Sequence, residues 1–529
     1  MKNIVCFIKE NYLIIAILLV FSFLKMPLIW QSYPIIYNID EPYLINSGLR
    51  VLYNFFKFGS LDPQFYDWGS FPIYVSAFLN AVLILIKYFF FNENNLSLEV
   101  LSYSIQRVDF HVLNRFFSLM LMNISTFIIY YFCKKNFNQF IALLSALIIT
   151  ISPKYISLST LATVDHWNVF FASLIIYYSF ELNKNFYSAK NVIIYGFILG
   201  ISVATKYSNF LFVVPFLTIF ANQILKKKFP IKQSIIFCFS SLFSFLVSMP
   251  YSIINFPDFI SSLRRISEHY NIGHIGADTN YNNSYFNLIE YFFSTIFINP
   301  LINALSIICI LFLLTKKNKQ LILITYPIIF CLFIGSYKVF FSRNLITILP
   351  FVSILSSLLI YEFYIISKKN LYKYFIFLIL ILVSLPTLKL NLKLIKKSLL
   401  TDTRYISLKW IEQNLNPNDQ IIATNYSPPV WNLESFQNSK KFWLIDYSKE
   451  KYSMNHIDDD TKYIILSSGA YGKYFNKDGS LVKRYQDKGG KIYLNLFKSN
   501  ELVKSFKADN KKTIGPEIRI YLNKSYTKK

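Results

Sequence analysis

The chain has 529 residues, of which 54% are hydrophobic, and a formal net charge of +25 at pH 7. Uninterrupted apolar runs of about 20 residues recur along it, a pattern that excludes a soluble protein and is typical of membrane-spanning helices. The excess of Lys and Arg would suit nucleic-acid binding, but these residues stand in short groups between apolar runs rather than along one face, so no nucleic acid is expected among the partners.

The first apolar run, Tyr12 to Trp30, lacks the small-residue cleavage site of a signal peptide and predicts a retained first helix. Basic groups follow five later apolar runs, at Lys134-Lys135, Lys184 with Lys190, Lys226 to Lys228, Lys316-Lys317 and Lys368-Lys369. Lys and Arg favour cytoplasmic loops, and all five groups fall inside if Phe71 to Phe91 does not cross the membrane. That aromatic-rich segment is therefore predicted to lie along the outer interface as a juxtamembrane helix.

This topology predicts an all-α polytopic bundle in the cell (inner) membrane, with eleven crossings, a cytoplasmic N-terminus and an extracytoplasmic C-terminus. The expected helices cover residues 12–30, 111–132, 139–158, 164–181, 191–205, 209–225, 232–253, 295–315, 320–338, 344–366 and 371–388. Three places then share the outer side: the loop from Gln31 to Phe110, the turn at Asp165-His166, and the loop from Asn255 to Asn287.

After Leu392 the composition becomes polar, which divides the chain into a membrane domain, 1–392, and a soluble α/β domain, 393–529, expected outside the cell membrane. In the second domain the pattern predicts a helix at Asp402 to Leu415. It predicts strands at Gln420 to Ala423, Tyr463 to Leu466 and Lys491 to Leu496.

Asp40-Glu41-Pro42 opens the first outer loop. A carboxylate held at a membrane boundary is a suitable proton acceptor for chemistry on a lipid-borne substrate. The same residues could equally start a helix, with Asp40 as N-cap and Pro42 in the first turn, and the two interpretations are compatible. Asp165 and His166 stand at the outer start of the fourth helix, where a cap is again the structural alternative. The topology nevertheless brings this second acid to the same membrane face as Asp40.

Two cations on that face are candidates for binding an anion. Lys206 lies between two short apolar runs, where a cation is costly unless it meets an anion or reaches water. Arg343 marks the outer turn before the tenth helix, and its guanidinium could bind a phosphate through two hydrogen bonds. The structural alternative for Lys206 is that its side chain extends to the membrane surface. Action of Asp40 and Lys206 on one substrate requires these two residues to lie at the same end of the bundle.

Two further stretches of the outer loops hold polar candidates. Asp62 to Pro72 combines acids, including Asp67, with aromatic rings that suit either a sugar or a membrane interface. The loop after Asn255 is dense in charged and His side chains, namely Arg264, Arg265, Glu268, His269, His274 and Asp278. Its two histidines are five residues apart, which is not a usual ligand spacing, so a divalent metal is left open as a cofactor and no ligands are assigned. The five cysteines show no disulfide or zinc pattern.

Several short stretches resemble the GT-C glycosyltransferases, and among them the protein O-mannosyltransferase-like branch that includes bacterial aminoarabinose transferases. The stretches extend in order over about 310 residues: Tyr37 to Pro42, Phe71 to Tyr74, Arg115 to Ser118, Ser152-Pro153, Thr163 to Asp165, Ala204 to Tyr207, Arg343 to Leu345, and Leu349-Pro350. Relatives often carry paired prolines in the first loop, where this chain has Gly69-Ser70-Phe71-Pro72. The C-terminal domain resembles tails of some bacterial members at Asp402 to Ile411 and Gly515 to Ile518.

The resemblance implies transfer of a sugar, with inversion, from a polyprenyl (undecaprenyl or dolichyl) phosphate to a hydroxyl of a lipid, glycan or protein acceptor. Asp40 would then be the general base, with Glu41 orienting it or the acceptor and Asp165 assisting. Lys206 and Arg343 would neutralise the departing phosphate. The remaining expected substrate-binding residues are His166, Tyr74 and Asp67.

Two other functions use a similar membrane face. A lipid-linked glycan flippase or transporter would need many helices and buried charge, but such proteins usually show repeated halves, and no repeat is present here. A glycan polymerase or ligase with a lipid-diphosphate donor would also need cations at this face, and assays with monophosphate and diphosphate carriers would separate it from the first reading.

Overall fold

A computed structural model describes residues 2–31, 33–35, 38, 40–91, 108–227, 230–272, 284–315, 320–366, 370–430, 433–436, 439–442, 445–446, 451–452, 457, 460–476, 478–482 and 489–526. Some residues named above lie outside these ranges: Tyr37, Ile39, Lys228, His274, Asp278, Lys316-Lys317 and Lys368-Lys369. The chain divides into two compact units. The first holds Met1–Ile29, Asp40–Ser104 and Asp109–Ile395, and the second holds Trp30–Ile39, Ile105–Val108 and Lys396–Lys529.

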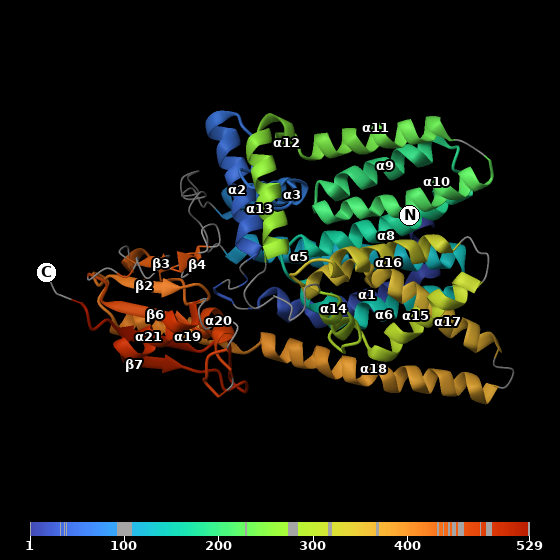
Figure 1. Ribbon diagram of the computed structural model, residues 1–529. Coiled ribbons are helices and arrows are strands. Elements are labelled where there is room, and N and C mark those ends of the chain that lie inside the picture. Colours follow the sequence, from blue (N-terminus) through green and yellow to red (C-terminus); the bar gives the residue numbers. More distant parts are fainter. Residues whose placement is uncertain are drawn as a thin grey trace. The chain divides into compact units, whose positions relative to one another are not determined.

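The first unit is a bundle of helices (Figure 1). In chain order its described α-helices are α1 (Lys2–Ile29), α2 (Asp40–Phe58), α3 (Phe71–Phe91), α5 (Val108–Asn136), α6 (Gln139–Ile151), α7 (Pro153–Leu158), α8 (Asp165–Lys184), α9 (Ala189–Val203), α10 (Val213–Leu225), α11 (Ile231–Ser248), α12 (Tyr251–Ile254), α13 (Phe256–Ile272), α14 (Tyr285–Phe292), α15 (Pro300–Thr315), α16 (Leu321–Gly335), α17 (Leu349–Ile366) and α18 (Asn370–Ser398). Two 3-10 helices, η1 (Tyr207–Phe212) and η2 (Ser342–Ile348), precede α10 and α17.

Within the described residues, each of the eleven predicted segments contains a helix, so the predicted polytopic bundle is confirmed. In the part of the chain that the structure describes, seven helical segments are long and apolar enough to cross a membrane, and four shorter apolar helices accompany them. The predicted helix at 139–158 is broken between α6 and α7 at Ser152, because Pro153 has no N–H to continue the hydrogen-bond ladder. Pro250 marks a similar break in the segment predicted at 232–253.

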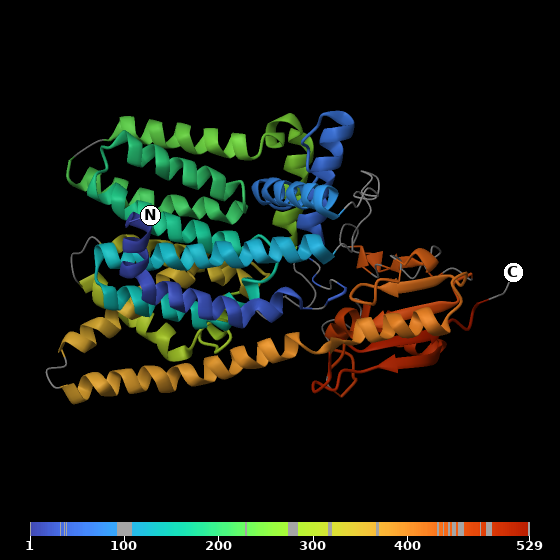
Figure 2. The same ribbon diagram turned by 180° about the vertical axis from the view of Figure 1, so that it is seen from behind.

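Helices α2, α3 and α13 gather at one end of the bundle and lie across its long helices (Figures 1 and 2). The residues of α3 are long and apolar enough to span a membrane. Its position across the bundle end instead agrees with the predicted juxtamembrane helix of the first outer loop.

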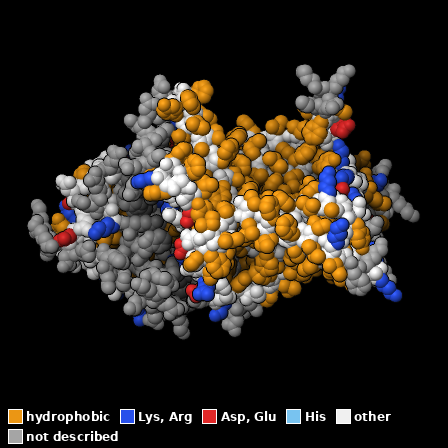
Figure 3. Space-filling model, turned by 90° about the horizontal axis from the view of Figure 1, so that it is seen from above, with side chains coloured by type: hydrophobic (Ala, Val, Ile, Leu, Met, Phe, Trp, Pro, Cys, Tyr) orange, Lys and Arg blue, Asp and Glu red, His pale blue; other side chains and the backbone are white. Residues whose placement is uncertain are grey.

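The charged residues divide between the two ends of the bundle. Helix α8 begins with Asp165 and has Lys184 in its last turn, and α5 ends with Lys134 and Lys135. Figure 3 shows one face of the molecule, where hydrophobic side chains cover the bundle and Lys and Arg side chains gather at one end. The basic residues at the ends of α5 and α8 therefore lie away from the end that carries Asp165.

The core of the bundle is one large cluster of buried apolar side chains contributed by helices from α1 to α17. Helices α9 and α11 run side by side (Figures 1 and 2), and Gly196 and Gly200 of α9 face Ser240 and Ser244 of α11. A Cβ atom on Gly200 would lie 2.2 Å from the carbonyl oxygen of Ser241. Two glycines four residues apart thus allow the close approach of these helix backbones.

The second unit has an α/β fold. Its described strands are β1 (Thr401–Asp402), β2 (Ile421–Thr424), β3 (Lys440–Phe442), β4 (Ile445–Asp446), β5 (Lys451–Tyr452), β6 (Tyr463–Ser467), β7 (Glu501–Phe506), β8 (Thr513–Ile514) and β9 (Ile518–Leu522). Its helices are α19 (Thr403–Asn414), α20 (Ser468–Tyr471) and α21 (Lys491–Ser499), with short 3-10 turns η4 (Glu434–Phe436) and η5 (Gly472–Tyr474). Five strands form one sheet in the order β3-β2-β6-β9-β7, with β2 parallel to β3 and β6, and β9 antiparallel to β6 and β7.

The predicted helix at Asp402 to Leu415 and the predicted strands at Gln420 to Ala423 and Tyr463 to Leu466 are confirmed as α19, β2 and β6. The predicted strand at Lys491 to Leu496 is wrong, because this segment is helix α21. Its buried residues, Tyr493 and Leu496, are three apart, which is the spacing of a helix face.

A short segment from the first loop belongs to the second unit. Ile35 is 3% exposed and packs in the same apolar cluster as Leu408, Ile411 and Ile465. The boundary expected at 392/393 falls inside α18, whose last turn contains Lys396 and Lys397.

Candidate active site

Asp40 and Arg343 form an ion pair in which the guanidinium donates to the carboxylate. Asp40 is the first residue of α2, where a negative charge is favoured by the helix dipole. Arg343 lies in η2, with its guanidinium carbon 5.2 Å from the centre of the Phe341 ring. Both side chains are partly exposed, 26% for Asp40 and 36% for Arg343, so a ligand could reach either of them.

Asp165, Lys206 and Asn344 form the adjoining part of the site. The Lys206 ammonium donates to Asp165 Oδ1 at 3.2 Å and to Asn344 Oδ1 at 2.9 Å. Asp165 is the first residue of α8 and is 2% exposed. The charge of Arg343 interacts with both Asp165 and Asp40, which joins the two ion pairs. Asp40 and Lys206 therefore lie at the same end of the bundle, as the phosphate-binding hypothesis requires.

The loop from residue 60 to 70 holds Lys206 in place. Lys206 is an extended residue between α9 and η1, and the hydroxyl of its neighbour Tyr207 donates to the carbonyls of Tyr66 and Trp68 at 2.7 and 3.1 Å. A Cβ on Gly69 would lie 1.8 Å from the Ala204 carbonyl oxygen. Only glycine, which has no Cβ, allows this close approach of the two backbones.

Glu41 faces away from this group and into the protein. It is fully buried, and Arg115 donates to Oε1 from Nε and to Oε2 from Nη2, both at 2.7 Å. The Ala162 N–H donates to Oε1 at 2.8 Å. Burial alone would raise the pKa of Glu41, but the Arg115 charge and these hydrogen bonds hold it below its ordinary value. Because Arg115 also donates to the Ile29 carbonyl at 2.8 Å, Glu41 ties the start of α2 to α1 and α5.

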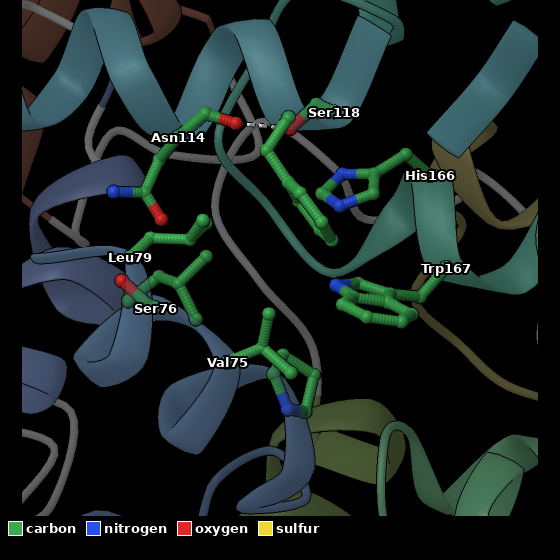
Figure 4. A pocket seen from close by; sticks show the side chains of 10 residues that line it. Val75, Ser76, Leu79, Asn114, Ser118, His166 and Trp167 are labelled. Atoms are coloured by element: carbon green, nitrogen blue, oxygen red, sulfur yellow. Dashed lines mark hydrogen bonds between the residues drawn. The ribbon is translucent and has the colours of Figure 1, made fainter. Parts of the chain in front are cut away.

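A small pocket adjoins the charged residues (Figure 4). Its lining comes from α2, α3, α5 and α8: Leu44, Pro72, Val75, Ser76, Leu79, Asn114, Phe117, Ser118, His166 and Trp167. The His166 ring lies between Ser118 and Trp167 in this view, and neither ring nitrogen has a hydrogen-bond partner among the described residues.

The other two expected substrate-binding residues, Asp67 and Tyr74, belong to the loop before α3 and to α3. Asp67 forms an ion pair with Arg265 of α13, in which the Arg265 side chain is exposed and the Asp67 side chain is partly exposed. The Tyr74 hydroxyl of α3 is buried and has no hydrogen-bond partner among the described residues.

The divalent metal left open from the sequence has no candidate site in the described part of the chain. No group of three His, Cys, Asp or Glu side chains is placed there to hold an ion. Glu268 and His269 lie on α13, whereas His274 and Asp278 fall in the range 273–283 that the structure does not describe.

Sequence reasoning missed three residues of the site. Asn344 and Arg115 stood in stretches that carry the family resemblance, but no role was assigned to them. Lys154 of α7 was also missed, although it follows an apolar run as Lys206 does. Its ammonium donates to the Ser342 hydroxyl at 3.3 Å, and its charge interacts with Asp165 and Arg343.

Comparison with known proteins gives one family match and several matches in fold. Residues 101–254 match the model of the dolichyl-phosphate-mannose-protein mannosyltransferase family. Compared by sequence, no curated protein matches the chain significantly.

Three solved structures illustrate the similarity in fold. ArnT from Cupriavidus metallidurans in the apo state is 10% identical with a TM-score of 0.56, over 98% of this chain and 99% of that chain. The same enzyme bound to undecaprenyl phosphate gives a TM-score of 0.55 at 10% identity, over 99% and 100% of the two chains. AglB, the oligosaccharyltransferase from Archaeoglobus fulgidus, in complex with an inhibitory peptide and a dolichol-phosphate, gives 0.53 at 11% identity, over 89% of this chain and 72% of that chain.

The comparisons confirm the resemblance found in the sequence. The family match covers α5 to α12, which contain Arg115, Lys154, Asp165 and Lys206. The chain thus shares its fold with GT-C glycosyltransferases along nearly its whole length, and its segment 101–254 matches a membrane mannosyltransferase family.

Proposed function

We propose that the chain transfers a sugar from a polyprenyl phosphate carrier to a hydroxyl group of a lipid, glycan or protein acceptor. The observation that carries the proposal is the junction of the Asp40–Arg343 and Asp165–Lys206 pairs at one end of the bundle. It sets a carboxylate that can accept a proton beside cations that can bind a phosphate. The fold is shared with one enzyme solved with undecaprenyl phosphate and another solved with a dolichol-phosphate, which supports a donor of this class.

The reaction is a single displacement at the sugar carbon C1. The acceptor oxygen attacks C1 while Asp40 takes its proton, and the bond between C1 and the phosphate oxygen breaks with its electron pair going to the lipid phosphate. Attack from the side opposite the phosphate inverts the configuration at C1. Lys206 and Arg343 stabilise the charge that grows on the phosphate, while Asp165 and Asn344 hold the Lys206 ammonium in position.

The Asp40–Arg343 pair links donor binding to proton transfer. Arg343 is bonded to the proposed base in the structure. A donor phosphate is a strong acceptor for the same guanidinium, so its binding draws Arg343 away and leaves the carboxylate available to the acceptor hydroxyl. Donor binding is therefore expected to precede proton transfer. Glu41 is a positioning residue in this scheme, since its oxygens are bonded to Arg115 and Ala162.

The test uses the full chain, purified and placed in lipid nanodiscs, with polyprenyl monophosphate and polyprenyl diphosphate sugars as alternative donors. Transfer from the monophosphate donor is expected, and Asp40→Asn should slow it about 10²–10⁴-fold, the usual contribution of a general base. Glu181→Gln is the matched control, because Glu181 is an ion-paired acid in the last turn of α8, at the opposite end of the helix from Asp165.

Two results would overturn parts of the proposal. Undiminished transfer by Asp40→Asn would remove Asp40 from the base role. Transfer from the diphosphate donor alone would favour a polymerase or ligase. Mass analysis of surface glycans in a deletion strain would then identify the sugar and the acceptor.

We further infer that the reaction takes place on the extracytoplasmic face of the cell (inner) membrane, with the N-terminus in the cytoplasm and the region 393–529 outside as a separate domain. The basic groups at the ends of α5 and α8 support this orientation, because Lys and Arg favour the cytoplasmic side. The charged site lies at the start of α2 and α8, at the other end of those helices.

A further inference from the structure

The charges of the four residues that form the two ion pairs of the site cancel one another. Asp40 pairs with Arg343, and Asp165 pairs with Lys206. Two carboxylates and two cations have no net charge, so this set alone has little attraction for an anion at long range. A site that binds a lipid phosphate needs a further positive charge.

Lys154 supplies such a charge in the right place. Its ammonium lies 3.3 Å from the hydroxyl of Ser342, the residue before Arg343, and its charge interacts with Asp165 and with Arg343. We propose that Lys154 is a third phosphate-binding cation of the site, which contacts the phosphate of the lipid-linked donor beside Arg343 and Lys206. The inference rests on the proposed function and deepens it.

The surroundings of Lys154 distinguish it from the other two cations. Arg343 and Lys206 each form a direct ion pair with a carboxylate, whereas the direct contacts of the Lys154 ammonium within the described residues are neutral: the Ser342 hydroxyl and the face of the Tyr291 ring, whose centre is 5.9 Å away. The residue is only partly exposed. A cation held in such surroundings is costly unless an anion joins it, so a bound phosphate would compensate for its burial.

The backbone at the break between α6 and α7 positions Lys154. The Ser152 hydroxyl accepts the N–H of Tyr155 at 3.2 Å and donates to the carbonyl of Phe297. Pro153 starts the short helix α7 directly after this cap. The chain therefore turns at Ser152-Pro153, and the next residue, Lys154, reaches η2 and Ser342 instead of continuing the direction of α6.

With Lys154 included, the group of Asp40, Asp165, Lys154, Lys206 and Arg343 has a net charge of +1. A sugar linked to the lipid through one phosphodiester has a charge of −1, which this group neutralises. A diphosphate link has a charge of −2 and would leave an excess negative charge. The charge count thus favours the monophosphate donor class.

The test measures binding of undecaprenyl phosphate and of uncharged undecaprenol to the purified full chain in detergent, which does not depend on activity. Lys154→Gln should weaken binding of the phosphate about ten- to a hundred-fold, the usual effect of losing one charge-assisted hydrogen bond, and leave undecaprenol binding unchanged. Lys154→Arg should keep most of the preference for the phosphate. Lys135→Gln is the control, since Lys135 is at the far end of α5 and contacts Tyr177 and Glu181.

Each outcome decides the proposal. Equal binding of undecaprenyl phosphate by wild type and Lys154→Gln would overturn it, as would a loss that is the same for both lipids, which would show a packing role. If Lys154→Gln does not fold, the test rests on Lys154→Arg. Loss of the preference for undecaprenyl phosphate over undecaprenol in Lys154→Arg would also overturn the proposal. A wild-type chain that binds neither lipid overturns this inference together with the proposed donor. A wild-type chain that binds the phosphate but transfers no sugar overturns the proposed reaction alone.

Discussion

At the scale of single residues, the Glu41–Arg115 ion pair is the part of the site most sensitive to substitution. Glu41 is fully buried, the Arg115 side chain is 3% exposed, and their hydrogen bonds fix the residue next to the proposed base. Removing one partner of such a pair leaves the other charge buried without compensation, which usually costs about 3–5 kcal/mol.

Glu41→Gln is therefore expected to destabilise the bundle by an amount in that range and to lower transfer activity, because α2 is no longer fixed at Asp40. Thermal unfolding of the purified protein, followed by tryptophan fluorescence, would measure the first effect. The double variant Glu41→Gln with Arg115→Met should unfold at a higher temperature than Glu41→Gln alone. A single variant as stable as the wild type would contradict the assigned role.

The pH dependence of unfolding gives a second measurement on the same pair. The pKa of Glu41 is lowered on folding. A carboxyl with a lowered pKa adds stability that is fully present above its unfolded pKa, about 4.3, and is lost as the pH falls through the folded value. The wild-type unfolding temperature should therefore fall more steeply than that of Glu41→Gln below about pH 4.3. Parallel curves for the two proteins would mean that Glu41 is not ionised in the folded state.

The sequence was informative about which charged residues meet. Asp40, Asp165, Lys206 and Arg343 could be grouped because helix count and basic loops assign each of them to one end of the bundle. Side-chain direction could not be obtained in this way. Asp40 and Glu41 are neighbours in sequence, yet one meets Arg343 and the other turns into the protein toward Arg115, because successive helix residues point about 100° apart. Lys154 was missed because its role depends on the turn at Ser152.

At the scale of helices, the contact between α9 and α11 controls the position of Lys206, since α9 ends at Val203, three residues before it. The contact depends on two glycines, Gly196 and Gly200. A Cβ on Gly200 would meet backbone atoms of α11, the Ser241 carbonyl oxygen at 2.2 Å and the Phe245 nitrogen at 2.8 Å, so the helices must separate to accept it.

Gly200→Ala is expected to destabilise the protein by about 1–3 kcal/mol, as overpacking usually does. It should also reduce transfer, because the end of α9 moves with the helix. Thermal unfolding and a transfer assay would measure the two effects. Gly472→Ala is the control, because a Cβ there has its nearest neighbour at 3.8 Å, an ordinary contact. If both variants unfold at the wild-type temperature, α9 and α11 do not pack as closely as the structure shows.

The elements themselves could be predicted where they are long and apolar. Helices of the bundle follow from apolar runs, but the breaks at Pro153 and Pro250 were not predicted, because the apolar runs continue through both prolines. Short elements of the second unit were harder to predict. In α21 the residues from Lys491 to Leu496 alternate polar and apolar side chains over a few positions, which imitates a strand, and tertiary packing of Tyr493 and Leu496 selects the helix. Ile35 could not be assigned to the second unit, because a single apolar residue in a loop has no periodic pattern.

At the scale of the whole molecule, the distribution of charge makes a prediction about sidedness. Arg264 of α13 is exposed. Its neighbour Arg265 forms an ion pair with Asp67, which lies in the first outer loop. Lys190, at the start of α9, is exposed and follows the basic end of α8. The predicted topology, which places the basic groups between the apolar runs in the cytoplasm, puts Lys190 on the cytoplasmic side and Arg264 on the outer side. The exposed Lys511 tests the side of the C-terminal region independently.

Single cysteines at these positions, in a chain whose five native cysteines are replaced, can be tested with a membrane-impermeant maleimide on intact spheroplasts. Arg264→Cys and Lys511→Cys should be labelled from outside, and Lys190→Cys only after the membrane is opened. Labelling of Lys190→Cys alone from outside would reverse the orientation and place the proposed reaction in the cytoplasm, where the charged site could still bind a lipid phosphate but from the other leaflet. Labelling of Arg264→Cys with protection of Lys511→Cys would instead mean that α18 does not cross the membrane, so that the chain would have ten crossings and a cytoplasmic C-terminal region.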